Sequence, residues 1–292
     1  MTVALVTGTS TGIGLATALH LARNDYRVYA SMRNLEGAKE IRTAAEKEEL
    51  DVRTLRLDVD DGQAVKERVA EVLNDAGRID VLVNNAGIGG GAAIEEMPEE
   101  AWKAMFETNF FGAIRMIQAV LPSMRQQGSG TIVNVSSVAG RFATPPQGAY
   151  SASKFALEAM SEVLAQEVAR YNVRVAIIEP GVILTPIFQK NLRPPDPDSP
   201  YVDGSRRLGF IFMKMLQDPS QPEVVAEAIQ HAIETNSPKL RYPVGAGADQ
   251  LLGGRQRITD EEWVALGKMT DDQWFAATEK IFGIDFRPPA GG

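Results

Sequence analysis

The chain has 292 residues, 44% of them hydrophobic, which is enough for one large domain or two small ones with a sizeable core. Thirty basic residues against 38 acidic ones give a net charge of −8, which argues against a basic surface for nucleic acid. The absence of cysteine excludes disulfides, thiol nucleophiles and thiolate metal sites, and no apolar stretch reaches the roughly 18 residues of a membrane span. We expect a cytoplasmic protein without a membrane span or a metal site.

Short β-branched runs alternate with amphipathic stretches along the first 245 residues. Parallel strands need crossover connections, which are almost always right-handed, so repeated strand–helix units wind into a sheet covered by helices on both faces. The sequence therefore predicts an α/β fold: a doubly wound parallel sheet of Rossmann type in one domain, residues 1–245. The seven expected strands are Val3–Thr7, Arg27–Ser31, Val52–Leu57, Val81–Asn84, Thr131–Ser136, Val173–Glu179 and Lys239–Val244.

A proline-rich segment from Pro186 to Pro200 interrupts this rhythm and is predicted to be a loop, because proline suits neither a regular ladder nor a helix interior. The apolar residues from Leu208 to Met215 form either the buried side of a surface helix or the lid of an apolar pocket. Residues 186–217 are the predicted substrate flap.

Residues 246–292 are predicted to be a helical extension packed on the same domain. Two sequence patterns in it are typical of capping boxes, in which a threonine caps a helix and the side chain three residues later bonds back. They run from Thr259 to Glu262 and from Thr270 to Gln273. Each predicts a short helix.

A glycine-rich turn lies between the first expected strand and an apolar helix. Glycine allows a ligand to approach the backbone closely, and a helix N-terminus presents free amides and a positive dipole end to a pyrophosphate. The turn therefore predicts a phosphate site for a dinucleotide. Its residues are Gly8, Ser10, Thr11, Gly12, Ile13 and Gly14.

The same turn also satisfies the G-x-S-x-G pattern of a hydrolase nucleophile elbow, which would make Ser10 a nucleophile. A hydrolase needs a later histidine, and the candidate is His231, inside the expected helix Pro222–Thr235. The hydrolase is the less favoured of the two readings.

Arg33 follows the second expected strand, where a carboxylate would hold the ribose 2′-hydroxyl of NAD. Its planar guanidinium suits a 2′-phosphate, so NADP(H) is the predicted cofactor in preference to NAD(H). The alternative is an ordinary surface arginine at the edge of the sheet.

Tyr150 and Lys154 lie one turn apart on one face of an expected helix. Ser137 ends the fifth expected strand, and the 13 residues to Tyr150 can bring the two hydroxyls together. Tyrosine ionises near pH 10 in isolation, so acid–base chemistry near neutrality needs its phenolate stabilised. An ammonium group one turn away is expected to lower the pKa of Tyr150.

Taken together, these motifs resemble those of the short-chain dehydrogenase/reductase family, in type and in order, over about residues 1–186. The Tyr29–Arg33, Tyr150–Leu157 and Pro222–Tyr242 stretches are similar to its 17β-hydroxysteroid and retinol dehydrogenase branch. The extension after Gly245 departs from most members. The matching motifs are Thr7-Gly8-x-x-x-Gly12-Ile13-Gly14, Asn84-Asn85-Ala86-Gly87, Asn109, Ser137, Tyr150-x-x-x-Lys154 and Pro180-Gly181.

The resemblance implies roles for these residues. Tyr150 would be the general acid and base, Lys154 its stabilising cation and Ser137 the donor to the substrate oxygen. Asn109 would hold a water that links Lys154 to solvent; alternatively it is a helix residue bonded to its own backbone. The cofactor contacts that the resemblance adds are Asp58, Asn85, Ala86, Gly87, Pro180, Gly181, Ile183 and Thr185.

Two of these cofactor assignments have plain alternatives. Asp58, the expected adenine contact, could instead be the N-cap of the helix that follows. Residues 84–87 could be an ordinary turn.

The predicted function is that of an NADP(H)-dependent oxidoreductase that interconverts a secondary alcohol and a ketone, on an apolar substrate of steroid, retinoid or fatty size. A nucleotide-sensing protein without turnover is the alternative from another class. The family implies a homodimer or homotetramer built on residues 109–124 and 150–171. The expected apolar lining of the substrate site is Phe142, Phe188, Leu192, Tyr201, Phe210 and Phe212.

Overall fold

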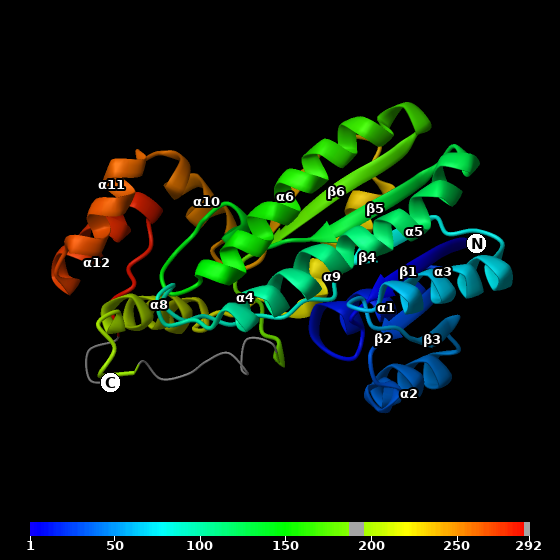
Figure 1. Ribbon diagram of the computed structural model, residues 1–292, viewed down its shortest axis with the longest axis horizontal. Helices are drawn as coiled ribbons and strands as arrows, with labels where there is room; N and C mark the ends of the chain where they lie inside the picture. The colour runs from blue at the N-terminus through cyan, green and yellow to red at the C-terminus, as the bar shows by residue number, and fades with distance from the viewer. Residues whose placement is uncertain (187–195, 289–292) are drawn as a thin grey trace.

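A single parallel sheet organises the molecule, whose computed structural model describes residues 1–186 and 196–288 (Figure 1). The order is β3-β2-β1-β4-β5-β6-β7, and every neighbouring pair is parallel. The strands are β1 (Thr2–Thr7), β2 (Tyr26–Met32), β3 (Val52–Arg56), β4 (Val81–Asn84), β5 (Gly130–Val135), β6 (Val173–Pro180) and β7 (Arg241–Val244). The chain reverses its direction of winding between β1 and β4, the position at which doubly wound sheets bind ligands.

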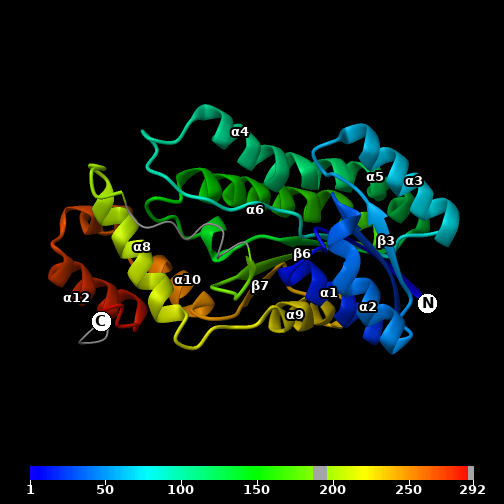
Figure 2. The same ribbon diagram turned by 90° about the horizontal axis from the view of Figure 1, so that it is seen from below.

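Helices cover both faces of this sheet, as Figure 2 shows. One layer holds α1 (Gly12–Arg23), α2 (Lys39–Glu48) and α9 (Pro222–Glu234), and the other holds α3 (Gly62–Ala76), α5 (Gly112–Gln127) and α6 (Gly148–Val168). Helix α4 (Glu99–Phe106) leads into α5 through a π-helical segment, Glu107–Phe111. Each face of the sheet has its own apolar core: the first core lies under α1, α2 and α9, and the second core lies under α3, α5 and α6. Along β1, Ala4 and Val6 belong to the first core while Val3 and Leu5 belong to the second, because successive side chains of a strand point to opposite faces.

All seven expected strands are present, and their ends differ from the expected ones by at most two residues. The largest difference is at β7, which begins at Arg241 instead of Lys239. The amide of Lys239 donates to the hydroxyl of Tyr242, 2.9 Å away. That amide is therefore used in a local turn before the ladder begins.

A third apolar cluster lies beyond the carboxyl ends of the strands, where the C-terminal helices pack (Figure 1). It is built by α8 (Val202–Met215), α10 (Ala248–Gln256), α11 (Asp260–Ala265) and α12 (Asp271–Phe282). Both expected capping boxes are formed, at Thr259 with Glu262 and at Thr270 with Gln273. No helix in the described part of the chain is long and apolar enough to cross a bilayer.

The apolar run from Leu208 to Met215 lies on helix α8. Ile211 and Met215 are buried against the C-terminal helices and form the inner side of this helix, whereas Met213 is 50% exposed. Arg207, only 7% exposed, donates to the carbonyl of Leu266 at 3.2 Å and to the carboxylate of Asp271 at 3.1 Å. The buried guanidinium fastens α8 to the C-terminal helices.

We expect Phe282→Ala to lower the free energy of unfolding by about 3–5 kcal/mol, because it empties the centre of the third cluster. The Phe282 ring is 3% exposed and lies 5.5 Å from the Phe142 ring, centroid to centroid. Urea denaturation measures the change. Val264→Ala is the control, since Val264 is 67% exposed. Equal denaturation midpoints for the two variants would contradict this account of the cluster.

Candidate active site

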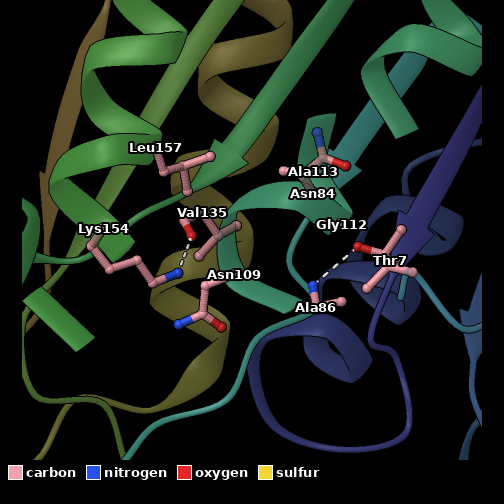
Figure 3. A pocket seen from close by; sticks show the side chains of 10 residues that line it. Thr7, Asn84, Ala86, Asn109, Gly112, Ala113, Val135, Lys154 and Leu157 are labelled. Atoms are coloured by element: carbon pink, nitrogen blue, oxygen red, sulfur yellow. Dashed lines mark hydrogen bonds between the residues drawn. The ribbon is translucent and has the colours of Figure 1, made fainter. Parts of the chain in front are cut away.

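The carboxyl ends of β1, β4, β5 and β6 meet at one edge of the sheet, and the residues that follow these strands face one another there. A small buried pocket lies among them (Figure 3). Parallel strands bring their following loops to a common edge, which is why motifs far apart in sequence converge. The pocket is lined by Thr7, Val59, Asn84, Ala86, Asn109, Gly112, Ala113, Val135, Lys154 and Leu157.

The glycine turn needs its glycines for steric reasons. Gly8 and Gly12 have φ values of 71° and 61°, in the left-handed region that favours glycine. A Cβ atom at Gly14 would lie 2.3 Å from the carbonyl oxygen of Gly8, so no side chain fits there. The Asn85 amide donates to the carbonyls of Thr7 at 2.9 Å and Gly8 at 3.1 Å. Asn85 thus straps the turn from the neighbouring strand.

The N-terminus of α1 is open to an anion. Thr11 is the N-cap residue, but its side chain makes no capping hydrogen bond, and the first turn holds no acidic residue. The first amides therefore keep their donors for a ligand, and the positive dipole end has no competing charge. A pyrophosphate fits this cradle.

Thr185 closes the cradle from the segment after β6. A Cβ atom at Gly12 would lie 3.2 Å from Cγ2 of Thr185, which is itself buried. Ile13 packs against the first core, and Ser10 packs against Gly37, where an added Cβ would lie 3.1 Å from that of Ser10. The structure therefore brings the expected residues of the turn and Thr185 together.

Neither histidine is engaged with Ser10, as the hydrolase interpretation would require. The His231 ring is on the exposed side of α9, with its centroid 6.0 Å from that of Tyr242. His20 forms a hydrogen bond of 2.6 Å with Gln230.

Thr7 joins the glycine turn to the loop after β4, a role that the sequence analysis missed. Its Oγ1 accepts hydrogen bonds from the backbone amides of Asn85 and Ala86, each at 3.0 Å. Gly87 follows, and a Cβ atom there would lie 3.2 Å from Oδ1 of Asn109 and 3.9 Å from Nζ of Lys154. A hydroxyl at the last position of β1, directly before a glycine, was the available signal.

The side chain of Tyr150 emerges from the first turn of α6. Burial raises the pKa of Tyr150, and the Ser137 hydroxyl, which hydrogen-bonds its phenol oxygen, partly offsets the rise. Ser137 also donates to the carbonyl of Pro180 at 3.4 Å. The two hydroxyls expected to meet therefore do so. The expected lowering of the pKa of Tyr150 is not found, because burial outweighs the hydrogen bond from Ser137.

Lys154 points into the protein instead of into solvent. Its ammonium donates to the carbonyl of Val135 at 2.9 Å (Figure 3). The same ammonium lies 5.8 Å from the centroid of the Tyr150 ring. Burial lowers the pKa of Lys154 to about 8, and the charge of Glu158 opposes that fall. The lysine thus sits beside the phenol as expected.

Asn109 lies in the π-helical segment before α5, and its amide ties down the loop after β4. The side chain donates to the carbonyl of Ile88 and to Ser153 Oγ, both at 3.0 Å, and accepts from the Ile88 amide at 2.8 Å. The alternative in which Asn109 bonds its own backbone is wrong, because these three hydrogen bonds go to Ile88 and Ser153. One lone pair of Oδ1 remains for a further donor.

Arg33 and Asp58 lie near the β2–β3 edge of the sheet. Arg33 is exposed directly after β2, and no ion pair or hydrogen bond of its guanidinium is found within the described ranges. Asp58 accepts from the amide of Asp60 at 3.2 Å. The N-cap of α3 is Asp61, which accepts from the amides of Gln63 and Ala64. Asp58 is therefore not the cap, and its carboxylate stays with the loop after β3.

The turn after β6 packs closely against the segment after β7. Gly181 donates to the carbonyl of Val244 at 2.9 Å, and a Cβ atom at Gly181 would lie 2.2 Å from the carbonyl oxygen of Ala246. Ile183 is buried beside Gly245. Pro180 and Gly181 thus place Ile183 and Thr185 by close backbone packing.

Part of the expected apolar lining is instead core. The ring of Phe142 is 5% exposed and lies 5.3 Å from that of Trp263, so it packs in the third cluster. Phe210 packs 5.2 Å from Phe275, and Phe212 packs on the same cluster. Tyr201 is exposed, and its hydroxyl donates to Glu95. Phe188 and Leu192 lie outside the described residues.

Comparison with known proteins decides the family. The sequence model of the short chain dehydrogenases matches residues 2–195. The chain belongs to the short-chain dehydrogenase family. The predicted resemblance to this family is confirmed.

Relatives within the short-chain dehydrogenases include both enzymes of the expected branch. Retinol dehydrogenase 8 of Bos taurus is 38% identical over 257 residues, which cover 81% of this chain and 79% of that protein. The 17-beta-hydroxysteroid dehydrogenase type 1 of Homo sapiens is 36% identical over 259 residues, covering 82% and 76%. The crystal structure of a short-chain dehydrogenase from Streptomyces avermitilis matches with a TM-score of 0.78 at 35% identity, covering 92% of this chain and 98% of that one.

As a short-chain dehydrogenase, the protein is an oxidoreductase that acts on alcohols or ketones with a nicotinamide dinucleotide. The glycine turn and the open end of α1 fit the phosphates of such a cofactor.

Burial of Lys154 should reduce stability at neutral pH. Its pKa falls from 10.5 in the unfolded chain to about 8 in the folded one, so below pH 8 the folded state carries the whole cost of the buried charge. Between pH 8 and 10.5 the folded protein loses the proton first, and the cost disappears. The stability advantage of Lys154→Met over the wild type should shrink by on the order of 2–3 kcal/mol across that window.

Urea unfolding at several pH values between 7 and 10.5 measures this difference. Lys268→Met, at an exposed position, should follow the wild type at every pH. A constant difference between Lys154→Met and the wild type would overturn the assignment.

Proposed function

We propose that this short-chain dehydrogenase is an NADP(H)-dependent enzyme that interconverts an apolar secondary alcohol and its ketone. The proposal rests on one arrangement: Ser137, Tyr150 and Lys154 lie together at the carboxyl edge of the sheet, beside the glycine turn. Both the chemical groups and the cofactor cradle face the same edge.

Tyr150 is the proposed general acid and base. A raised pKa keeps its phenol protonated at neutral pH, ready to donate to a ketone oxygen that is being reduced. The Ser137 hydroxyl donates to the same substrate oxygen, and the Lys154 ammonium favours the phenolate that proton transfer leaves behind. The nicotinamide, when bound, supplies or accepts the hydride.

Asn109 is the proposed holder of a water beside Lys154. Its Oδ1 already accepts from Ile88 and has one lone pair left, and that oxygen and the ammonium both border Gly87. A water bound there can return a proton to the lysine from solvent.

The remaining cofactor assignments follow from position. Thr185 would bond the nicotinamide carboxamide and Ile183 would brace the ring, since both lie on the segment that closes the glycine turn. Gly87 and Asp58 would border the ribose and the adenine. Asn85 is better described as the support of the turn than as a direct cofactor contact.

NADP(H) is the proposed cofactor because of Arg33. The guanidinium is exposed beyond β2, and it can form a charged fork with a 2′-phosphate. A cell that keeps its NADPH pool reduced would drive the enzyme toward ketone reduction.

An apolar substrate is the part of the proposal that rests on relatives. The two named relatives act, by their names, on retinol and on a 17β-hydroxysteroid. The proposed assembly is a homodimer or homotetramer. Three exposed apolar side chains in the π-helical segment and on α6 support it: Phe111, Phe155 and Val163. The proposed location is the cytoplasm.

Tyr150→Phe should lower turnover by about 100-fold to 10,000-fold while NADPH binding stays unchanged, because only the transferable proton is removed. A panel of ketones followed by NADPH oxidation, with calorimetry for binding, measures both quantities. Tyr171→Phe is the control. Tyr171 lies just after α6, and its ring centroid is 5.8 Å from the guanidinium of Arg125 on α5. Full turnover by Tyr150→Phe would refute the role of the phenol. Tight NADPH binding with no turnover by the wild type would indicate a nucleotide-sensing protein.

Arg33→Ala should weaken NADPH binding by about 1–3 kcal/mol and leave NADH binding unchanged, because it removes a charged contact to the 2′-phosphate alone. Calorimetric titration with each cofactor measures the difference. Arg42→Ala is the matched control, since Arg42 is also exposed near this sheet edge and bonds Thr54 at 2.9 Å. Unchanged NADPH affinity in Arg33→Ala would remove Arg33 from the site.

A further inference from the structure

A buried carboxylate lies behind Lys154, one turn further along α6. Glu158 is 4% exposed, and an added Cβ at Gly140 would lie 2.9 Å from its Cγ and 2.7 Å from Oγ of Ser136. The Ser136 hydroxyl thus faces this carboxylate, which the mechanism above does not use.

Three side chains of α6 therefore reach three successive residues at the end of β5. Tyr150 meets Ser137 and Lys154 bonds Val135. Glu158 faces Ser136, the residue between Val135 and Ser137. The spacing of four residues keeps all three on one face of the helix.

Glu158 belongs to a group of five charges, one of which, Glu162, binds Arg241 at the surface. Its Oε2 lies 2.9 Å from Nε of Arg241, and the same Nε lies 3.6 Å from Oε1 of Glu179 on β6. Arg141, from the loop after Ser137, reaches the same Oε1 of Glu179 at 3.3 Å. Glu179 is fully buried, whereas the two arginines are 26% and 34% exposed and reach inward from the surface.

The two arginines leave one oxygen of each carboxylate without a hydrogen bond among the described residues. Oε1 of Glu158 and Oε2 of Glu179 are buried and have no hydrogen-bond partner within residues 1–186 and 196–288. Burial raises the pKa of both groups, and the charge of Glu158 raises that of Glu179 further. The charges of Arg241 and Arg141 oppose this rise in Glu158, and the ionised carboxylate of Glu158 acts on Lys154, which lies one helical turn away on α6.

Lys154 needs such a charge. Its one hydrogen bond in the described structure goes to a neutral carbonyl, and an ammonium ion that has lost its water is costly without a counter-ion. The charged and titratable groups that face it are Tyr150 and Glu158, and behind these lie Glu162 from α6, Glu179 from β6, Arg241 from β7 and Arg141 from the loop after β5.

We propose that Glu158, backed by Glu179, is the internal counter-charge that holds the Lys154 ammonium in place and in its charged form. Glu158 is then a positioning residue for proton transfer at Tyr150. This inference rests on the function proposed above for Tyr150 and Lys154.

The test compares Glu158→Gln with Glu162→Gln. Both glutamates bind Arg241 at 2.9 Å, but Glu162 is 56% exposed and lies one turn further from Lys154. The pKa of Lys154 is measured by NMR titration of protein carrying ¹³C at the lysine Cε, with the signal assigned by its loss in Lys154→Met. We expect Glu158→Gln to lower this pKa by about one unit and Glu162→Gln to leave it unchanged.

An unchanged pKa in Glu158→Gln, or an equal shift in Glu162→Gln, would overturn the proposal. If Glu158→Gln does not fold, Glu179→Gln takes its place, and we expect the same direction of shift. The titration needs no substrate, so failure of the proposed oxidoreductase function would leave it readable. In an active enzyme the limb of the pH–kcat profile that reports Lys154 should move with the NMR value, and KM for NADPH should not.

Discussion

The hydrogen bond from the Lys154 ammonium to the Val135 carbonyl is the contact on which the site depends. It places a cation at the end of β5, two residues before Ser137, in a position from which water is largely removed. Removal of water strengthens every electrostatic interaction there and also makes the charge costly. Polar groups surround the buried ammonium: the phenol of Tyr150 on one side, the carboxylate of Glu158 on the other, and the side-chain amide of Asn109.

The third apolar cluster gives this end of the sheet a rigid boundary. Phe142 follows Ser137 by five residues, and its ring is held between Trp263 and Phe282 of the C-terminal helices. The loop that carries Ser137 is therefore anchored to a part of the chain beyond the region matched by the family model. Through Arg207 the same helices also hold α8. The described helices of the C-terminal extension thus hold the loop that carries Ser137 through Phe142.

Features set by local chemistry could be predicted from the sequence. β-Branched runs gave the strands, threonine with an acid or amide three residues later gave both capping boxes, and the four-residue spacing brought Tyr150 beside Lys154. Features decided by tertiary packing could not be predicted. The sequence analysis considers Asp58 as a possible cap, whereas in the structure Asp61 caps α3 and Asp58 stays in the loop after β3. An aromatic residue in a loop gives no sign of what will cover it, so the sequence does not predict that Phe142 packs against Trp263 and Phe282. Nor does hydrophobic periodicity reveal a buried acid such as Glu158.

The hydrogen bonds of Thr7 and Asn85 that hold the glycine turn affect the affinity for the dinucleotide. Thr7 and Asn85 hold the turn and the loop after β4 in one hydrogen-bonded unit through contacts that involve only the protein. The dinucleotide site is therefore preorganised, so binding does not include a free-energy cost for ordering this part of the backbone. Loss of either hydrogen-bonding residue would weaken binding of the nucleotide and leave Ser137, Tyr150 and Lys154 in place.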